Sequence, residues 1–486
     1  MKSLKLFIDE GAEEKKEEKY RILVVSAEAE NNELFHTAQR ITDEAKKLGH
    51  EVYVVKVEGA SILFKDGVYK IFNTDDKEGF ELNSKDTIAI VRGTVRLKKS
   101  WLDLLTTIEK TGATMVNSRE TIEVTADKYR SYIRLLDFGL TQPKTAIVPS
   151  PENWKPALES LNTEFPVIMK TLEGSKGIGV LFIESERSLE SLIQLLYNQN
   201  EDADLLIQEY IKTDKDVRVL ILNDTVVAAM SREIVEGDFR SNYSQGAKVE
   251  KYKLTALETE QSLLSAKSVG GVWTAVDFIP SQQPEKEPPY ILEVNHSPGT
   301  KGIESIGTNV VENLLVYFQN PKNRHPVAKE IGRYERVELV GLGTIVANFD
   351  TGNSARAIIH SDGWKVKNKK VTWKAFGKSF EHDLVEMRHF EQGKWSWSSK
   401  TPIERPVIYL DVEFNGTKYT DVQFLIDDRA HKTTKCLMNQ TFMKRSNVMI
   451  NPAKTFVVST KHGVKPDGKF KDNAFDLFNF NGEIDK

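Results

Sequence analysis

The sequence is poor in cysteine and has no long apolar segment. Cys436 is its single cysteine, so an intramolecular disulfide framework is excluded and a reducing compartment is expected. No apolar run approaches the roughly 18 residues of a membrane-spanning helix, and the N-terminus lacks the apolar core of a signal peptide. These absences predict a cytoplasmic protein that does not enter a membrane.

An excess of positive charge is also missing. The 67 Lys and Arg residues against 71 Asp and Glu residues give a formal net charge of −4. Because nucleic-acid binding usually depends on basic charge, no nucleic-acid partner is expected. A chain of 486 residues is too long for one hydrophobic core, and its length predicts about three domains.

Breaks in the sequence pattern divide the chain into segments. Strands alternate with helices in residues 20–117, which predicts a small parallel sheet covered on its faces, and the absence of GxGxxG there argues against a dinucleotide site. The full division is a charged arm at 1–19, an N-terminal α/β domain at 20–117, a mixed domain at 118–319, a polar linker at 320–335, a strand-rich domain at 336–460 and a tail at 461–486.

The stretch 270–299 predicts two paired strands that carry oxygen ligands. Asp277 lies on the first strand, and Glu293 and Asn295 lie on the second. Side chains two residues apart on a strand point the same way, so the three can share one face. Two carboxylates and an amide oxygen would suit Mg²⁺, which prefers hard oxygen ligands. An amphipathic hairpin with its polar side chains in water would show the same pattern.

Candidate nucleotide-binding residues precede this hairpin. The glycines of GSKGIG (174–179) allow close approach of the backbone to phosphate, and Lys176 adds charge. Lys170 ends a strand and Lys128 lies on a helix, although either could be a solvated surface lysine. EGDFRSN (236–242) offers Arg240, and arginine suits phosphate or carboxylate recognition.

Six motifs in order resemble those of the ATP-grasp ligases: TADKYRS, MKTLEGSKGIGV, QEYI, EGDFRSN, VDF and LEVNHSPG. Over residues 20–320 the chain looks most like the RimK-type branch, which adds glutamate to the C-terminus of a ribosomal protein. The resemblance implies an α/β and α+β ATP-grasp fold, in which an N-terminal parallel-sheet domain precedes two ATP-grasp lobes. ATP and Mg²⁺ or Mn²⁺ would be the cofactors.

The resemblance also implies site residues. They are Lys128 and Lys170 on the phosphates; Gly174, Ser175, Lys176, Gly177 and Gly179 as a lid; Glu209, Tyr210 and Ile211 at the adenine; Asp216 at the ribose; Arg240, Ser241 and Asn242 near the reacting phosphate, with Arg240 catalytic; Arg232 at the acceptor carboxylate, also catalytic; and Asp277, Glu293 and Asn295 on the metal.

Such enzymes convert a carboxylate to an acyl phosphate, which an amine then attacks to give an amide or peptide bond. That chemistry needs charge neutralisation and alignment rather than a covalent nucleophile. The loop SQQPEKEPP is long and the segment around Thr213 to Lys215 is short for the family, so the acceptor's identity does not carry over.

The strand-rich C-terminal domain carries one motif of its own. FDTGNS (349–354) places Asp350 in an Asp-Thr-Gly turn, as in aspartic proteases, where two such aspartates share a proton. A single copy would require a dimer. VGLGTIVANFDTGNSARAIIH resembles the retropepsin-like family described as ATP-dependent zinc proteases, which implies an all-β barrel, but Asn439 replaces the expected glycine of a later turn. The histidines show no zinc-ligand spacing; they are His360, His382, His389 and His431.

The sequence therefore predicts a ligase that joins an amino acid such as glutamate to a peptide or protein and works as a homo-oligomer, either a dimer or a tetramer. Two alternatives concern the C-terminal domain. It could be an aspartic peptidase that cleaves peptides as a dimer with Asp350 as the catalytic residue, or a non-catalytic unit for dimerisation or substrate docking.

Overall fold

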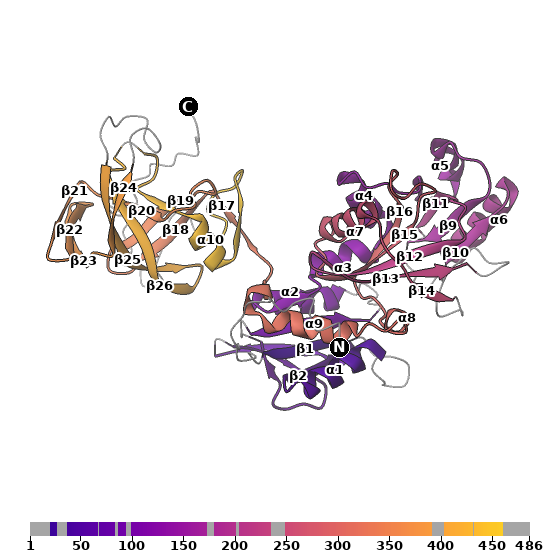
Figure 1. Cartoon of the computed structure of the whole chain (residues 1–486), viewed down its shortest axis with the longest axis horizontal. Helices are drawn as coiled ribbons and strands as arrows, with labels where there is room; N and C mark the ends of the chain where they lie inside the picture. The colour runs from indigo at the N-terminus through magenta and orange to yellow at the C-terminus, as the bar shows by residue number, and fades with distance from the viewer. Residues whose placement is uncertain are drawn as a thin grey trace. The chain divides into compact units, whose positions relative to one another are not determined.

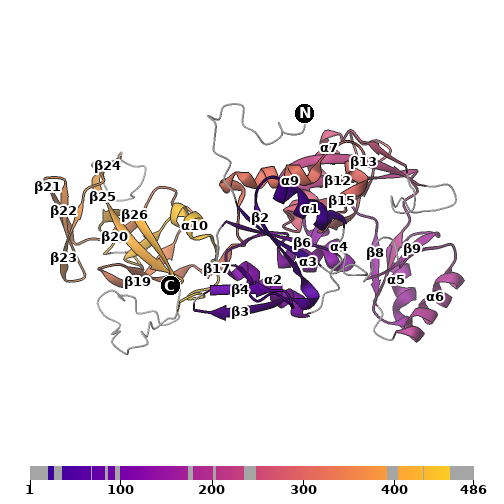
Figure 2. The same cartoon turned by 90° about the horizontal axis from the view of Figure 1, so that it is seen from below.

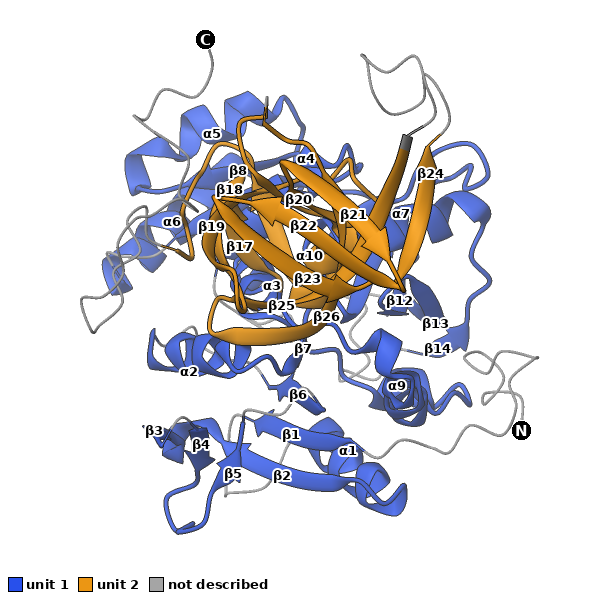
Figure 3. Ribbon diagram, turned by 90° about the vertical axis from the view of Figure 1, so that its left-hand side faces the viewer, with its two compact units in different colours: residues 1–327 blue, residues 328–486 orange. Residues whose placement is uncertain are grey.

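The computed structural model describes residues 20–26, 36–66, 68–82, 86–93, 99–172, 179–200, 204–234, 248–390, 403–430 and 432–459. The chain divides into two compact units, residues 1–327 and residues 328–486 (Figure 3). The predicted charged arm and C-terminal tail lie outside the described residues.

Unit 1 begins with a four-stranded parallel sheet in the order β2-β1-β6-β7, of which Figure 1 labels β1 and β2. Its central strands are buried on both faces, as is typical of near-continuous apolar runs in parallel sheets. A small antiparallel sheet of β3, β4 and β5 lies beside it. The elements are β1 (Arg21–Ser26), α1 (His36–Lys47), β2 (Glu51–Lys56), β3 (Ser61–Lys65), β4 (Val68–Phe72), β5 (Phe80–Glu81), β6 (Thr87–Arg92), α2 (Lys99–Lys110) and β7 (Thr114–Val116).

The first lobe of the following region is a four-stranded antiparallel sheet in the order β10-β9-β11-β8. Helices α5 and α6 share a hydrophobic core with one face of this sheet. The elements are α3 (Arg119–Ala126), α4 (Lys128–Asp137), β8 (Thr145–Val148), α5 (Trp154–Leu161), β9 (Val167–Thr171), β10 (Val180–Ile183), α6 (Glu186–Gln199) and β11 (Leu205–Glu209).

The second lobe is a five-stranded antiparallel sheet in the order β14-β13-β12-β15-β16. One face shares a core with α4 and α7, and the other shares a core with the N-terminal domain, α1 and α9. The elements are β12 (Lys215–Leu222), β13 (Thr225–Glu233), β14 (Val249–Lys251), α7 (Ala256–Ser268), β15 (Trp273–Ile279), β16 (Tyr290–Asn295), α8 (Lys301–Glu304) and α9 (Val310–Gln319). The predicted parallel-sheet domain followed by two α+β lobes is confirmed.

Unit 2 is a barrel. Its strands pair in the order β18-β19-β27-β20-β26-β25, and β18 also pairs with β25, which closes the ring. Closure leaves β24 as an added strand on β25, and Figure 2 shows β21, β22 and β23 as a separate small sheet. The predicted all-β retropepsin-like barrel is confirmed.

The elements of unit 2 are β17 (Lys329–Gly332), β18 (Tyr334–Leu339), β19 (Gly343–Phe349), β20 (Ala357–His360), β21 (Gly363–Lys367), β22 (Lys370–Ala375), β23 (Lys378–Asp383), β24 (Glu386–Phe390), β25 (Ile403–Phe414), β26 (Thr417–Asp427), β27 (Cys436–Met438), α10 (Gln440–Ser446) and β28 (Val448–Asn451). Among the residues described in both units, no helix combines the length and apolar character needed to cross a bilayer.

Candidate active site

The hairpin of β15 and β16 carries the three proposed metal ligands. Asp277 lies directly opposite Glu293, and Ala275 lies opposite Asn295, so the three polar side chains share one face of the sheet. The Nδ2 of Asn295 donates a hydrogen bond to the Oε1 of Glu293 over 3.0 Å. The antiparallel register therefore brings the three side chains together.

Asp277 is held by two arginines. The Nε and Nη2 of Arg218 donate to its two carboxylate oxygens at 2.7 and 2.5 Å, and the Nη2 of Arg232 lies 3.1 Å from Oδ2. Burial alone would raise the pKa of Asp277, but the two guanidinium groups outweigh it and hold the pKa below its usual range. Asp277 is therefore a permanent anion at neutral pH.

Arg232 bridges two buried carboxylates. Its Nε and Nη2 both donate to Asp216 at 2.6 Å, in addition to the contact with Asp277. Burial would lower the pKa of Arg232, but Asp277 and Asp216 together raise it. In this arrangement both oxygens of Asp216 accept hydrogen bonds from Arg232. The ribose contact of Asp216 and the acceptor contact of Arg232 stay predictions.

The two predicted phosphate lysines lie at one pocket with Glu293. The Nζ of Lys128 donates to the carbonyl oxygens of Thr171 and Leu172, both at 3.0 Å, and the Nζ of Lys170 donates to Gln208 Oε1 at 2.7 Å. The pocket is lined by Thr125, Lys128, Ser131, Tyr132, Gln142, Thr145, Lys170, Leu206, Gln208, Leu292 and Glu293.

The pKa of the Lys170 side chain is shifted from its ordinary value. Burial lowers its pKa, Glu293 opposes the shift and Lys128 adds to it, and together they bring the pKa to about 8. Lys170 is therefore a cation near neutral pH that is held in an unfavourable environment. Such a site would be stabilised by an anion such as a phosphate group.

The remaining predicted nucleotide contacts are placed only in part. The Oε1 of Glu209 accepts a hydrogen bond from the backbone N–H of Lys144, and the ring of Tyr210 packs edge-on against Phe182, while Ile211 follows the end of β11. Gly179 has φ +80°, and a Cβ there would lie 2.3 Å from the Oγ1 of Thr171, so this position requires glycine.

Several residues of the predicted site lie outside the described residues. They are Gly174, Ser175, Lys176 and Gly177 of the glycine-rich segment, and Arg240, Ser241 and Asn242.

Sequence analysis missed Gln208 and Arg218 as site residues. Gln208 accepts from Lys170 and donates to Thr145 Oγ1 at 2.7 Å, so it connects the lysine to the sheet. Its signal was a polar residue inside the apolar strand LLIQE. Arg218 follows Asp216 by two residues on β12, so the alternation of that strand could have placed both on one face.

The hairpin residues fit a magnesium ion by their chemistry. An ionised carboxylate offers about four lone-pair positions. Asp277 uses three of these on its two arginines, while Glu293 accepts one bond from Asn295. Glu293, the Oδ1 of Asn295 and one position of Asp277 would thus supply the oxygen ligands that Mg²⁺ prefers.

In unit 2, Asp350 directly follows β19. Its backbone N–H donates to Met438 O at 3.0 Å, and its Oδ1 accepts from the backbone N–H of Gly352 at 2.8 Å. Asn439 has φ −99°, caps α10 through a 3.1 Å bond from the backbone N–H of Phe442, and donates to Ala355 O at 3.0 Å. Asn439 therefore joins the Asp-Thr-Gly loop to α10, and its backbone does not need glycine there.

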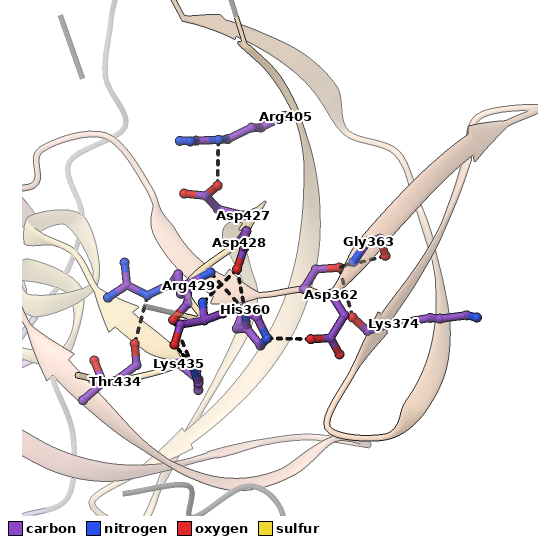
Figure 4. A network of polar contacts seen from close by, with 12 residues as sticks. His360, Asp362, Gly363, Lys374, Arg405, Asp427, Asp428, Arg429, Thr434 and Lys435 are labelled. Carbon is purple, nitrogen blue, oxygen red and sulfur yellow. Dashed lines mark hydrogen bonds and ion pairs between the residues drawn. The ribbon is translucent and has the colours of Figure 1, made fainter. Parts of the chain in front are cut away.

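A polar network surrounds His360 (Figure 4). One ring nitrogen lies 3.0 Å from Asp362, and the other accepts from the backbone N–H of Arg429 at 3.0 Å. Burial lowers the pKa of Arg429, and Asp350 is among the acidic groups that oppose the shift, so the network lies close to Asp350. Among the described residues, which exclude His431, no three His, Cys, Asp or Glu side chains are grouped to hold a metal.

The two lobes, with a pocket that contains Lys128, Lys170 and Glu293 of the acidic hairpin, define the chain as an ATP-grasp ligase. A family model described as "RimK-like ATP-grasp domain" matches residues 125–318, and one described as "Retropepsin-like aspartic endopeptidase RimB" matches residues 330–461.

Relatives of known name support the assignment to this family. A probable alpha-L-glutamate ligase of Pseudoalteromonas translucida is 30% identical over 290 residues, which are 59% of this chain and 92% of the relative. A protein of the same name from Coxiella burnetii is 35% identical over 229 residues, 47% of this chain and 73% of the relative. The chain therefore belongs to the RimK-like ATP-grasp ligases, with a retropepsin-like domain after the ligase, and it uses ATP and Mg²⁺.

Among solved structures, the chain is similar to the ATP-grasp ligase PsnB complexed with minimal precursor. It is 20% identical, covers 62% of this chain and 100% of its own, and has a TM-score of 0.47.

Proposed function

We propose that the chain is a cytoplasmic ligase that adds an amino acid such as glutamate to a peptide or protein, at the expense of ATP. The observation that carries this proposal is the pocket in which Lys128, Lys170 and Glu293 converge from three different elements. Two cations beside a carboxylate suit a nucleotide phosphate with its metal ion. The glutamate ligase names of the relatives support the choice of amino acid.

In this proposal each group acts through charge and position. Lys128 and Lys170 neutralise the phosphates of ATP, and Asp277, Glu293 and Asn295 hold Mg²⁺, whose charge offsets that of the phosphates. Bound ATP would then offer its terminal phosphate to the substrate carboxylate, and the acyl phosphate would be attacked by the amine. The positions of the cations matter most, because phosphoryl transfer depends on alignment and charge stabilisation.

We assign the remaining residues of the predicted site roles that follow from the family resemblance. Arg232 and Arg240 would stabilise charge at the reacting groups; the lid would comprise Gly174, Ser175, Lys176, Gly177 and Gly179; and the base, ribose and phosphates would be contacted by Glu209, Tyr210, Ile211, Asp216, Ser241 and Asn242.

A screen of amine-dependent ADP release tests the proposal. The full-length protein is incubated with Mg²⁺-ATP, peptides with free C-terminal carboxylates and single amino acids, and products are weighed by mass spectrometry. A mass gain equal to one added amino acid residue, with glutamate the best substrate, is expected. No ADP release with any pair would contradict the proposal.

Glu293→Gln tests the metal assignment in the same assay. The variant keeps the shape of the side chain but removes its charge, so ADP release should fall at least 100-fold. Glu260→Gln, on the exposed side of α7, is the matched control and should turn over normally. Normal turnover of Glu293→Gln would disprove metal binding by this residue.

A second candidate activity belongs to unit 2. Asp350 is fixed at the end of β19 beside Met438 and Asn439, and its Oδ1 accepts from the turn that follows. A pair of such aspartates, which activates water in aspartic peptidases, would require a second copy of the chain. Asp350→Asn should then abolish peptide cleavage while ADP release is retained. Cleavage that persists in this variant would leave unit 2 with a docking or dimerisation role.

A further inference from the structure

Arg92 is a buried arginine at the carboxyl end of a central strand. It ends β6, which lies between β1 and β7 in the parallel sheet, and only 3% of the residue is exposed. Ligands of open α/β sheets bind outside the carboxyl ends of the strands. Arg92 therefore lies where such a sheet places its ligand contacts.

The guanidinium of Arg92 is only partly used by the protein. Its Nη2 donates to Pro298 O at 2.6 Å, and the group lies 4.9 Å from the ring centre of Trp273. Its Nε and Nη1 are buried and have no hydrogen-bond partner, and no carboxylate of the described residues pairs with it. Three N–H donors of a buried cation are thus left without an acceptor.

Such an arrangement is costly unless an anion completes it. Burial lowers the pKa of Arg92 to about 9, so the side chain is still a cation at neutral pH. A buried charge without a counter-ion costs several kcal/mol, and buried donors without acceptors add to that cost. The local structure therefore indicates a missing anionic ligand.

Arg324 is a second buried arginine of unit 1, and its charge is paired within the protein. It too lies 4.9 Å from an aromatic ring, that of Tyr20, and donates to a backbone carbonyl, Phe318 O. Unlike Arg92, it also pairs with a carboxylate, that of Asp86, at 3.3 Å. The carboxylate that Arg324 receives from the protein is what Arg92 lacks.

Two further groups without partners lie around Arg92. The Nε1 of Trp273 and the Nε2 of His296 are both buried and have no hydrogen-bond partner in the part of the chain that the structure describes. Asn117 fixes both residues, since its Nδ2 donates to Trp273 O at 2.8 Å and to His296 O at 2.7 Å. The unpaired atoms therefore belong to a rigid part of the structure.

The pocket that contains Lys128 and Lys170 lies next to the cluster formed by Arg92, Trp273 and His296. The other ring nitrogen of His296 is hydrogen-bonded at 2.8 Å to Thr125 Oγ1, and Thr125 lines the pocket of Lys128 and Lys170. Trp273 and Asp277 share one face of β15, four residues or roughly 13 Å apart. Arg92 is thus connected through Trp273 to the strand that carries Asp277, and its neighbour His296 is connected through Thr125 to the lysine pocket.

We propose that Arg92 binds a free carboxylate of a substrate, and so selects the acidic or carboxyl-terminated compound that the ligase joins. This rests on the proposed ligase function. Arg218 and Arg232 already pair with Asp277 and Asp216, whereas Arg92 pairs with no carboxylate among the described residues. The carboxylate comes either from the amino acid that is added or from the peptide that receives it.

Calorimetric titration of the full-length protein, saturated with Mg²⁺ and a non-hydrolysable ATP analogue, tests this. The titrants are L-glutamate, its α-amide and side-chain amide, and a peptide with a free or an amidated C-terminus. The wild type should bind one acid at least ten-fold more tightly than the matching amide. Arg92→Met should lose that preference, and Arg92→Lys should keep part of it.

Arg324→Met is the matched control, since it also removes a buried, ring-stacked arginine, and it should keep the full acid-to-amide preference. If Arg92→Met does not fold, the proposal is still tested by the acid-to-amide preference of Arg92→Lys compared with that of the wild type. Unchanged acid-to-amide ratios for both carboxylate sources in Arg92→Lys and Arg92→Met would overturn the inference. Because binding is measured without turnover, failure of the ligase proposal in the ADP screen is a separate result.

Discussion

At the scale of single residues, the burial of the Lys170 cation reduces the stability of the fold. Its pKa is lowered to about 8 by burial, against an ordinary value near 10.5. The unfolded chain therefore binds the proton more tightly than the folded one. The loss of folding stability caused by the charged lysine is fully present below about pH 8 and disappears as the pH rises past 10.5. Lys170 therefore makes the stability of the protein increase with pH between these values.

Lys170→Met should therefore stabilise the nucleotide-free protein while weakening ATP binding. One pKa unit corresponds to about 1.4 kcal/mol, so a gain of about 1 to 3 kcal/mol at pH 7 is expected. Urea unfolding at pH 7 and pH 10.5 measures it, and the gain should shrink at the higher pH. Lys267→Met, an exposed lysine of α7, should change neither property. A loss of stability at pH 7 would contradict this prediction.

The pairing of Asp216 with Arg232 shows what the sequence could not supply. The turn between β12 and β13 lies at Asn223-Asp224, and counting back from it pairs Asp216 with Ser231. A bulge between Leu220 and Ile221 shifts the register by one residue, which brings Arg232 opposite Asp216 instead. A one-residue shift exchanges the faces of a strand, so this ion pair depends on a feature without a clear sequence signal.

The meeting of Lys128, Lys170 and Glu293 was more predictable. Lys170 and Glu293 are charged residues of largely apolar strands, Lys128 begins α4, and the order of motifs placed all three in one site. Gln208 and Thr125 were not predictable from local pattern, because their places in the pocket depend on how α3, β11 and β16 pack together.

At the scale of elements, Asn117 joins the parallel sheet to the second lobe. It follows β7, and its side chain donates to Trp273 O and His296 O and accepts from the backbone N–H groups of Val272 and Trp273, all within 2.9 Å. The side chain is buried, so the backbone groups it leaves behind would have no water to replace it.

Asn117→Ala should destabilise unit 1 by about 3 kcal/mol, the sum expected for several buried hydrogen bonds. Chemical unfolding of the full chain measures the change. Asn153→Ala removes an exposed asparagine that bonds only Ser150 among the described contacts, and it should stay within about 0.5 kcal/mol of the wild type. Equal effects of the two substitutions would show that Asn117 does not join the lobes.

The cap of α10 gives a second prediction at this scale. Asn439 accepts from Phe442 at the start of the helix and donates to Ala355 in the Asp-Thr-Gly loop. Asn439→Ala should cost about 1 to 2 kcal/mol, since it removes an N-cap and a buried donor. Hydrogen exchange of residues 440–446 should speed up, and that of the loop around Asp350 should too. Lys444→Ala, on the exposed face of the same helix, should leave the loop unchanged.

At the scale of the whole molecule, the two units have separate hydrophobic cores. The core of unit 2 contains residues from Ile331 to Met443, and the four cores of unit 1 contain residues from Tyr20 to Phe318. The alternation of strands and helices predicted the parallel sheet at the start of unit 1, and the resemblance to ATP-grasp ligases implied the two lobes. Closure of the barrel was harder to predict, because it depends on the pairing of Glu338 with Glu413 and of Leu339 with Val412, which are far apart in the sequence.

Because the two units have separate cores, the full-length chain should unfold in two transitions. Bound nucleotide should stabilise only one of them. A ligand that binds only the folded state stabilises it by about 2.7 kcal/mol at 100 times its dissociation constant. A non-hydrolysable ATP analogue with Mg²⁺ should therefore raise the transition of unit 1 and leave that of unit 2 in place. Hydrogen exchange followed by mass spectrometry assigns each transition to its unit, for example through β12 and β26. Glu293→Gln should abolish the shift in unit 1 while both transitions remain. A single transition that moves as a whole would mean that the units unfold together, and a shift confined to unit 2 would place the nucleotide outside the ATP-grasp lobes.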